Sequence, residues 1–166
     1  MISTFAADMK ITLLTVGKTD KDWVRAGMDI YIGRLKHYIN FTLTEIPELK
    51  KVSALSREQI KSKEGELILK NIRPSDDVVL LDEHGKMFSS VEWASVLEGK
   101  MSGGTARDMV FVIGGAYGFS REVYDRCDSM ISLSRMTFSH QMVRAIFTEQ
   151  LYRAFTIIKG EPYHHE

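Results

Sequence analysis

Residues 110–120 read VFVIGGAYGFS, and residues 132–155 read SLSRMTFSHQMVRAIFTEQLYRAF. In the first stretch an apolar run of strand type ends in a double glycine, which leaves backbone bare for the close approach of a ligand. In the second, a loop of small polar residues leads into an amphipathic pattern that predicts a long helix over residues 141–159. Together the two stretches predict two loops that border one site.

Along the whole chain, short apolar runs predict buried strands over residues 11–16, 41–46, 78–81, 109–113 and 130–133. Helices are expected between them, starting near Asp20 or Asp22, at Ser56, at Ser89 or Ser90, and at Ser120. Ser56 and Gln59 have the spacing of a capping box. The first helix is expected to bury a face made of Trp23, Ala26, Ile30, Leu35 and Tyr38. This alternation predicts an α/β domain with a largely parallel sheet.

Composition narrows the class of protein. The 166 residues are 44% hydrophobic and 27% charged, which is typical of one soluble domain. We expect residues 9–166 to form that domain and residues 1–8 to be a loose N-terminal extension. No long apolar run predicts a membrane span or a secretory signal. One cysteine, Cys127, fits a cytoplasmic protein without disulfides, and the histidines lack the spacing of a metal site.

The formal net charge is zero, because 22 basic residues balance 22 acidic ones. A free-standing nucleic-acid binder usually carries a basic excess, so a protein of this charge that acts on RNA has to concentrate its positive charge locally or be guided by a larger particle. The local basic concentration consists of Lys50, Lys51, Arg57, Lys61 and Lys63. It is either a solvated face or a contact with nucleic acid.

Three predicted strands end in loops whose residues could bind a ligand, at Leu81-Asp82, Gly114-Gly115 and Ser132–Phe138. Ligands of parallel sheets bind at the carboxyl ends of strands, so this convergence favours a small-molecule site. Taken singly, the glycines also fit a tight turn, and the serine-rich loop fits a helix approach capped by Thr137 or Ser139. His140 and Arg144 share one helix face, which is either solvated or part of the site.

These residues carry a resemblance. The chain is similar, nearly end to end, to the SPOUT-class ribosomal RNA large subunit methyltransferase H family. The matching segments are MKITLLTVGK (9–18), KEGE (63–66), LLDEHGK (80–86), VFVIGGAYG (110–118), LSRMTFSHQMVRAIFTEQLYRAF (133–155) and PYHHE (162–166). The resemblance implies a C-terminal trefoil knot, a homodimer, and methylation of N3 of a pseudouridine in 23S ribosomal RNA, on the large subunit or the ribosome.

The resemblance also implies S-adenosylmethionine as cofactor, bound by Leu81, Gly114, Leu133, Ser134, Arg135, Met136, Thr137 and Phe138. Arg144, Tyr152 and His164 match positions associated with substrate and catalysis, as does His165. The imide proton at N3 has to leave, and His140 or His164 is the candidate acceptor, with Arg144 or Arg153 stabilising the anion. No metal is needed for this chemistry.

Two positions depart from the family pattern. Ser139 stands where the family usually has proline, and His165 and Glu166 follow His164 where many members have arginine or lysine. Two alternative functions therefore stay open. One is a SPOUT methyltransferase that acts on transfer RNA, and the other is a non-catalytic S-adenosylmethionine-binding protein associated with the ribosome.

Overall fold

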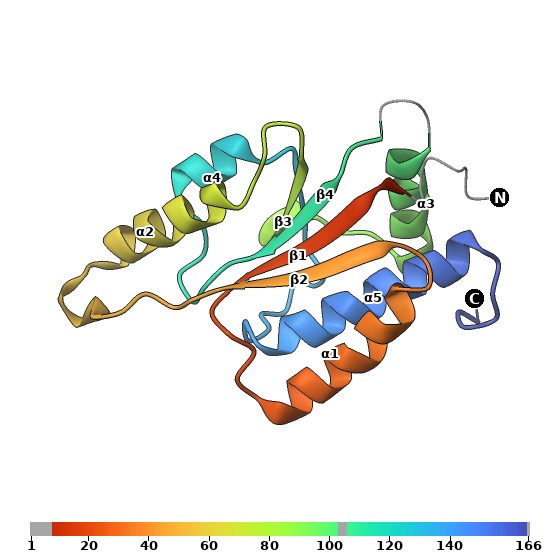
Figure 1. Cartoon of the computed structure of the whole chain (residues 1–166), viewed down its shortest axis with the longest axis horizontal. Coiled ribbons are helices and arrows are strands. Elements are labelled where there is room, and N and C mark those ends of the chain that lie inside the picture. The colour runs from red at the N-terminus through yellow and green to blue at the C-terminus, as the bar shows by residue number, and fades with distance from the viewer. Residues whose placement is uncertain (1–7, 103–105, 166) are drawn as a thin grey trace.

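Five parallel strands lie in the order β2-β1-β4-β3-β5 within residues 8–102 and 106–165, the part of the chain that the computed structural model describes (Figure 1). The strands are β1 (Lys10–Val16), β2 (Asn40–Ile46), β3 (Asp77–Lys86), β4 (Met109–Ile113) and β5 (Ser129–Ile131). The helices are α1 (Asp22–Leu35), α2 (Arg57–Lys70), α3 (Ser90–Met101), α4 (Arg121–Arg126) and α5 (Met142–Ile158). The predicted α/β fold is confirmed; the expected N-terminal extension lies outside the described residues except for Asp8.

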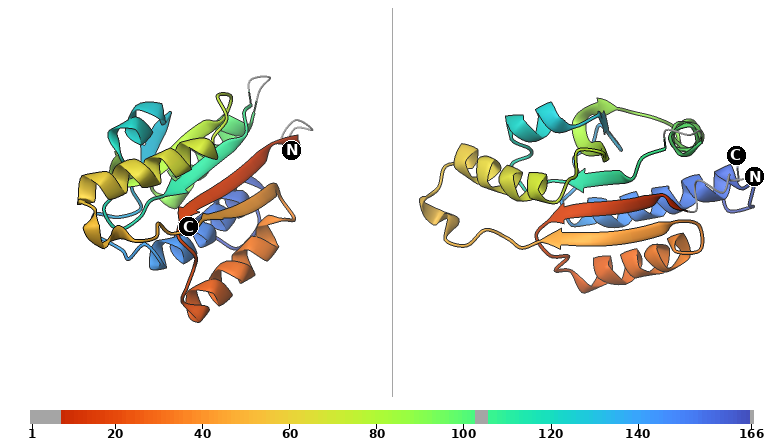
Figure 2. Two further views of the ribbon diagram at one scale, coloured as in Figure 1. Left: turned by 60° about the vertical axis from the view of Figure 1, so that its left-hand side comes forward. Right: turned by 45° about the horizontal axis from the view of Figure 1, so that its top comes forward.

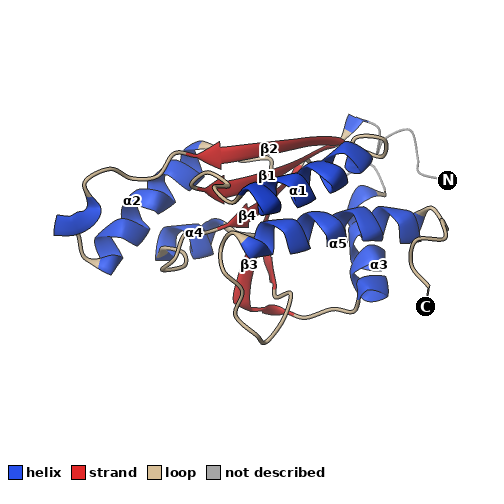
Figure 3. Cartoon of the chain, turned by 90° about the horizontal axis from the view of Figure 1, so that it is seen from below, coloured by secondary structure: helices blue, strands red, loops and turns tan. Residues whose placement is uncertain are grey.

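Helices cover both faces of the sheet, and the strands are apolar on both sides for this reason (Figure 2). In β4, Phe111 points to the face covered by α1, α3 and α5, while Val112 points to the face covered by α2 and α4. Figure 3 shows α1 and α5 lying side by side beneath the sheet, and they are in contact. The long helix α5 is thus a central element of one layer.

Three helices begin at predicted serines, because Ser56, Ser89 and Ser120 are the N-caps of α2, α3 and α4. The hydroxyls of Ser56 and Ser89 each accept a hydrogen bond from the amide of the third helical residue, and their own amides donate to the side chain of that residue, so α2 and α3 both start with a complete capping box. The prediction for α1 was wrong in two respects. Lys21 occupies its N-cap without a side-chain bond, and the buried face consists of Val24, Met28 and Leu35. Trp23 and Ile30 are exposed, because the register of the helix on the sheet differs from the one expected.

The end of β3 folds around the chain at β5. Ile131 pairs with Leu81 and again with Lys86, and the amide of Ser132 donates to the carbonyl of Lys86 at 3.0 Å. β3 therefore continues beyond its predicted end at Leu81. A Cβ atom on Gly85 would lie 2.5 Å from the carbonyl carbon of Ile131, so the two backbones touch. Residues 82–85 therefore pass close to the backbone of β5.

Neither a membrane-spanning helix nor a group of metal ligands is found among the described residues. None of the helices there has both the length and the apolar character to cross a membrane. No group of three or more histidine, cysteine, aspartate and glutamate side chains lies close enough to hold a metal ion in that same part of the chain.

Candidate functional site

Leu81, at the irregularity within β3, lies level with the carboxyl ends of β4 and β5. It pairs with Ile113 of β4 on one side and with Ile131 of β5 on the other. The residues that follow these three positions therefore emerge at one edge of the sheet, where they surround a cavity of about 890 Å³. This volume is in the range of small-molecule sites.

The structure brings together all the residues predicted to bind the cofactor. The cavity is lined by Leu81, Gly114, Leu133, Ser134, Arg135, Met136, Thr137 and Phe138. His140, one of the predicted catalytic residues, lines the same cavity at its exposed side. Segments separated by more than fifty positions in the sequence thus form one wall, because the strand register aligns their ends.

Gly114 shapes the floor of this cavity. A Cβ atom at this position would lie 3.0 Å from Cε1 of the Phe119 ring, tighter than ordinary contact. Any larger residue would have to displace Phe119, which is buried. The absence of a side chain at Gly114 therefore lets the Phe119 ring pack against the backbone at the cavity wall.

The serine-rich loop is held in shape by its own side chains. The Ser132 hydroxyl donates to the carbonyl of Ser134 at 3.0 Å, and the Ser134 hydroxyl accepts from the amide of Met136 at 2.9 Å. Ser139 accepts from the amide of Met142 at 3.0 Å, at the entrance to α5. Ser139 therefore closes the turn that leads into α5, whose N-cap position is taken by Gln141, and the loop borders the cavity as well. A proline at position 139 could not make this bond, since it has no hydroxyl group.

Asp82, which the sequence placed at one of the three strand ends without giving it a role, lines the cavity. The Asp82 carboxylate, whose side chain is 8% exposed, accepts hydrogen bonds from the Tyr124 hydroxyl at 2.5 Å and from His84 Nδ1 at 2.8 Å. Burial alone would raise the pKa of Asp82, but these hydrogen bonds outweigh burial and hold it below its usual value. Burial and the neighbouring carboxylate raise the pKa of Tyr124. The signal in the sequence was the acidic residue directly after a buried strand.

Arg144 does not line the cavity, and its contact with substrate stays a prediction. Its side chain is completely buried. Nη1 donates to the carbonyl of Gly17 at 2.9 Å and Nη2 to the carbonyl of Val16 at 2.9 Å, while Nε donates to the carbonyl of His140 at 2.9 Å. These bonds use the guanidinium to join α5 to the end of β1. Its role is therefore to position His140 and the start of α5.

Tyr152 and His164 lie outside the residues that line the cavity, on the later part of α5 and on the segment after it. The Tyr152 ring packs against Tyr163 with 4.8 Å between centroids. Nη1 of Arg153 lies 3.0 Å from Nδ1 of His164, and Arg153 also pairs with Glu149 at 2.7 Å. Within one chain these groups form a second cluster, separate from the cavity.

Comparisons with known proteins agree on the family. The family described as predicted SPOUT methyltransferase matches residues 9–164. A ribosomal RNA large subunit methyltransferase H from Christiangramia forsetii is 60% identical over 157 residues, which cover 95% of this chain and 99% of the relative. One of the same name from Phocaeicola vulgatus is 58% identical over 95% of this chain and 100% of its own length. A solved structure of the SpoU methyltransferase AviRb from Streptomyces viridochromogenes is a remote likeness, with 11% identity, a TM-score of 0.44, and coverage of 95% of this chain and 63% of that one.

Proposed function

The chain belongs to the SPOUT methyltransferases and, within them, to the ribosomal RNA large subunit methyltransferase H family, and from this we propose that it methylates N3 of a pseudouridine in 23S ribosomal RNA with S-adenosylmethionine as donor. The observation that carries the proposal is the single cavity formed by the three strand ends. A ribosomal substrate places the reaction in the cytoplasm.

The residues around the cavity suit the cofactor. S-adenosylmethionine, when bound, supplies a methyl group on a positively charged sulfur. Leu133 and Phe138 offer apolar surface for a purine ring, and the backbone of residues 133–138 offers hydrogen-bonding groups for its edge. Gly114 lines the cavity with backbone, against which the Phe119 ring packs. The cavity holds a nucleoside in a defined place, and such positioning contributes about 7–11 kcal/mol to lowering a transfer barrier.

His140 is the group in this chain that we assign to the proton of the target base. N3 of a uracil-type base is an imide, so it becomes a good nucleophile when its proton is removed. His140 lies at the exposed side of the cavity, where a base would enter. Arg144 holds the carbonyl of His140 through Nε, so it fixes the backbone that carries the imidazole. His140 acts on the base, and Arg144 is a positioning residue.

Tyr152 and His164 take part through a homodimer in this proposal. Within one chain they lie apart from the cavity, so a second copy has to bring them to it. His164 of the partner subunit would then join His140 beside the base. This arrangement gives each composite site residues from both subunits, and Arg153 beside His164 supplies the positive charge for the anionic base.

The neutral charge supports a particle as substrate. A protein without a basic excess gains little from phosphate neutralisation, so its affinity for naked RNA is weak and depends weakly on salt. Shape and a composite surface on the assembled subunit or ribosome supply the recognition instead. The methyl transfer needs no metal, and we expect full activity in the presence of EDTA.

One experiment tests the function and both alternatives. The protein is incubated with labelled S-adenosylmethionine and ribosomes that lack the modification, and the RNA is digested to nucleosides. Label in N3-methylpseudouridine is the expected result. Label in transfer RNA would support the transfer RNA enzyme, and cofactor binding without any transfer would support the non-catalytic protein.

A further inference from the structure

A tight turn at the rim of the cavity presents an aromatic side chain to solvent. Gly115 and Gly118 face one another as a bridge pair, and the amide of Gly118 donates to the carbonyl of Gly115 at 3.2 Å. Gly118 adopts a φ of 82°, which closes the turn and which other residues rarely reach. Ala116 and Tyr117 therefore stand at its tip. Tyr117 is 45% exposed although it lines the cavity.

A planar cation from a distant segment lies against this ring. The guanidinium carbon of Arg57 is 5.2 Å from the centre of the Tyr117 ring. Arg57 is the first residue of α2, and the Ser56–Gln59 capping box fixes the start of that helix. The exposed arginine and the exposed tyrosine are thus held together from two rigid elements. The pair forms a flat surface at the cavity mouth.

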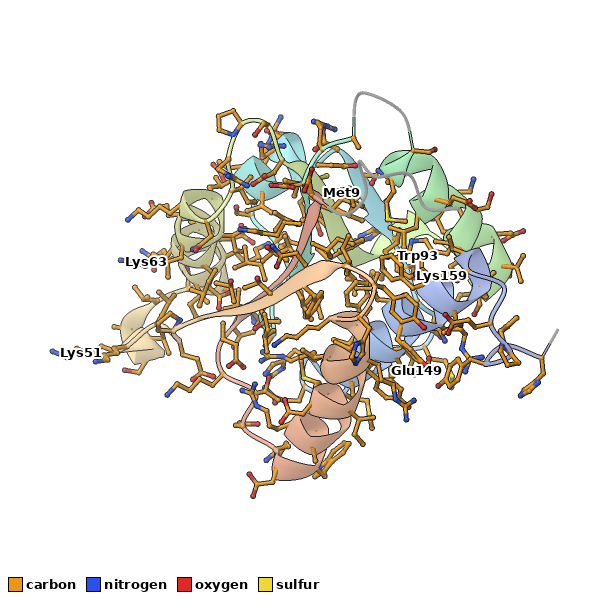
Figure 4. All side chains as sticks on the ribbon, turned by 45° about the vertical axis from the view of Figure 1, so that its right-hand side comes forward. Met9, Lys51, Lys63, Trp93, Glu149 and Lys159 are labelled. Carbon is orange, nitrogen blue, oxygen red and sulfur yellow. The ribbon has the colours of Figure 1, made fainter. Side chains whose placement is uncertain are left out.

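The charged groups around this pair are mixed in sign. Lys61 and Arg135 line the same cavity, as do Glu58 and Glu83, and Lys61 pairs with Glu58 at 2.8 Å. Figure 4 shows Lys51 and Lys63 directed outward on the arm formed by α2 and the segment before it. Asp82 lines the cavity too, but its carboxylate already accepts hydrogen bonds from Tyr124 and His84. A flat aromatic and guanidinium surface bordered by lysines fits an unpaired nucleobase with its flanking phosphates.

We propose that Tyr117 and Arg57 form a stacking platform for an unstacked nucleobase of the ribosomal RNA. This inference rests on the proposed function, because the same cavity has to receive the target base. A base that is to react must leave its stack, which costs a few kcal/mol, and an aromatic ring outside the stack recovers part of that cost. Tyr117 and Arg57 position the RNA, and the predicted cofactor loop of residues 133–138 lines the same cavity.

Four variants separate stacking from other roles. Tyr117→Ala removes the ring and Tyr117→Phe keeps it, while Arg57→Leu removes the planar cation and Arg57→Lys keeps only its charge. Arg121→Leu on α4 is the matched control, because Arg121 is 91% exposed and lies outside the cavity lining. For each variant, calorimetry gives the Kd for S-adenosylmethionine, and methyl transfer to unmodified ribosomes gives KM and kcat.

We expect Tyr117→Ala to lower kcat/KM for the ribosome about five- to a hundredfold, the range for loss of one base-stacking contact. Tyr117→Phe should stay within about twofold of the wild type, because the ring remains. Arg57→Leu should cost about two- to fivefold, and Arg57→Lys should recover only part of it, since an ammonium does not stack. The Kd for S-adenosylmethionine and the Arg121→Leu control should not change.

Two results would overturn the platform while the proposed function stands: an active wild type with Tyr117→Ala equal to it, or a Tyr117→Ala defect that appears wholly in the Kd for S-adenosylmethionine. The second result would make Tyr117 part of the cofactor wall. A folded wild type that transfers no methyl group to ribosomes would instead overturn the proposed function, and the platform with it.

Discussion

Nη2 of Arg144 donates a hydrogen bond to the carbonyl oxygen of Val16 at 2.9 Å, which joins the first turn of α5 to the end of the first strand. Gln141 supports this connection, because its Nε2 donates to the carbonyl of Lys18 at 3.0 Å and its Oε1 accepts from the amide of Asp20 at 3.0 Å. In the sequence, His140 directly follows the loop residues that line the cavity and directly precedes Gln141. The two side chains thus fix the place where the cavity meets α5.

Arg144→Met should destabilise the protein by about 3 kcal/mol, because it leaves the carbonyls of Val16 and Gly17 buried without their donor. Urea unfolding with a constant slope measures this loss. Arg144→Lys keeps a charge but not the planar fork, so its free energy of unfolding should lie between those of the wild type and Arg144→Met. A fully stable but inactive Arg144→Met protein would show that Arg144 contacts the substrate after all.

Gly85→Ala should cost at least about 3 kcal/mol, since the added methyl group meets the backbone of Ile131 at 2.5 Å and a backbone contact is hard to relieve. Gly99→Ala in α3 is the matched control, because nothing lies within 4 Å of its Cβ position and alanine favours a helix. It should stabilise the protein by about 0.5–1 kcal/mol. Equal stability of the two variants would contradict the close passage of residues 82–85 around β5.

Tyr124→Phe should lower the part of the free energy of unfolding that depends on pH. Because the folded state lowers the pKa of Asp82, its ionised form stabilises the fold above the unfolded pKa of about 3.9. That contribution is lost as pH falls through the lower folded pKa. Without the hydroxyl donor the folded pKa moves upward, so the variant should lose about 1.5 kcal/mol near pH 7 and less in acid.

Urea unfolding at pH 7 and at pH 3 measures this difference. Tyr38→Phe is the matched control, because the Tyr38 hydroxyl donates to Glu161 at 2.5 Å at an exposed position. Exposed pairs contribute little, so it should lose well under about 1 kcal/mol. A pH-independent loss in Tyr124→Phe would mean that the hydroxyl acts without changing the ionisation of Asp82.

Local signals predicted the parts of the structure that local chemistry decides. The Ser56–Gln59 spacing identified the start of α2, and the apolar run 109–113 gave the bounds of β4. The cavity lining was also predictable, because three loops follow three parallel strands and such ends meet at one edge. These features depend on neighbours in sequence or on one general rule of sheets.

The predictions that failed concerned packing between elements that are distant in the sequence. The polar character of Arg144 indicated either solvent or substrate, and a buried guanidinium bonded to the carbonyls of Val16 and Gly17 leaves no trace in residue spacing. Trp23 looked like a core residue by size, but the docking of α1 on the sheet leaves it exposed. The extension of β3 to Lys86 likewise depends on pairing with Ile131, which no local pattern encodes.

The composite site predicts recovery of activity from two inactive proteins. Gly114→Val fills the cavity against Phe119, and His164→Ala removes the imidazole of the C-terminal segment. Each variant alone should be nearly inactive, whereas refolding them together in equal amounts should restore about a quarter of the wild-type activity, because random pairing puts half of the subunits in mixed dimers with one intact site each. Gly114→Val mixed with Phe138→Ala is the control and should restore nothing, since both changes damage the cofactor half. Methyl transfer to unmodified ribosomes is the measurement, and two affinity tags confirm that mixed dimers form. Mixed dimers without recovered activity would contradict the proposal that one subunit's C-terminal segment completes the site of its partner.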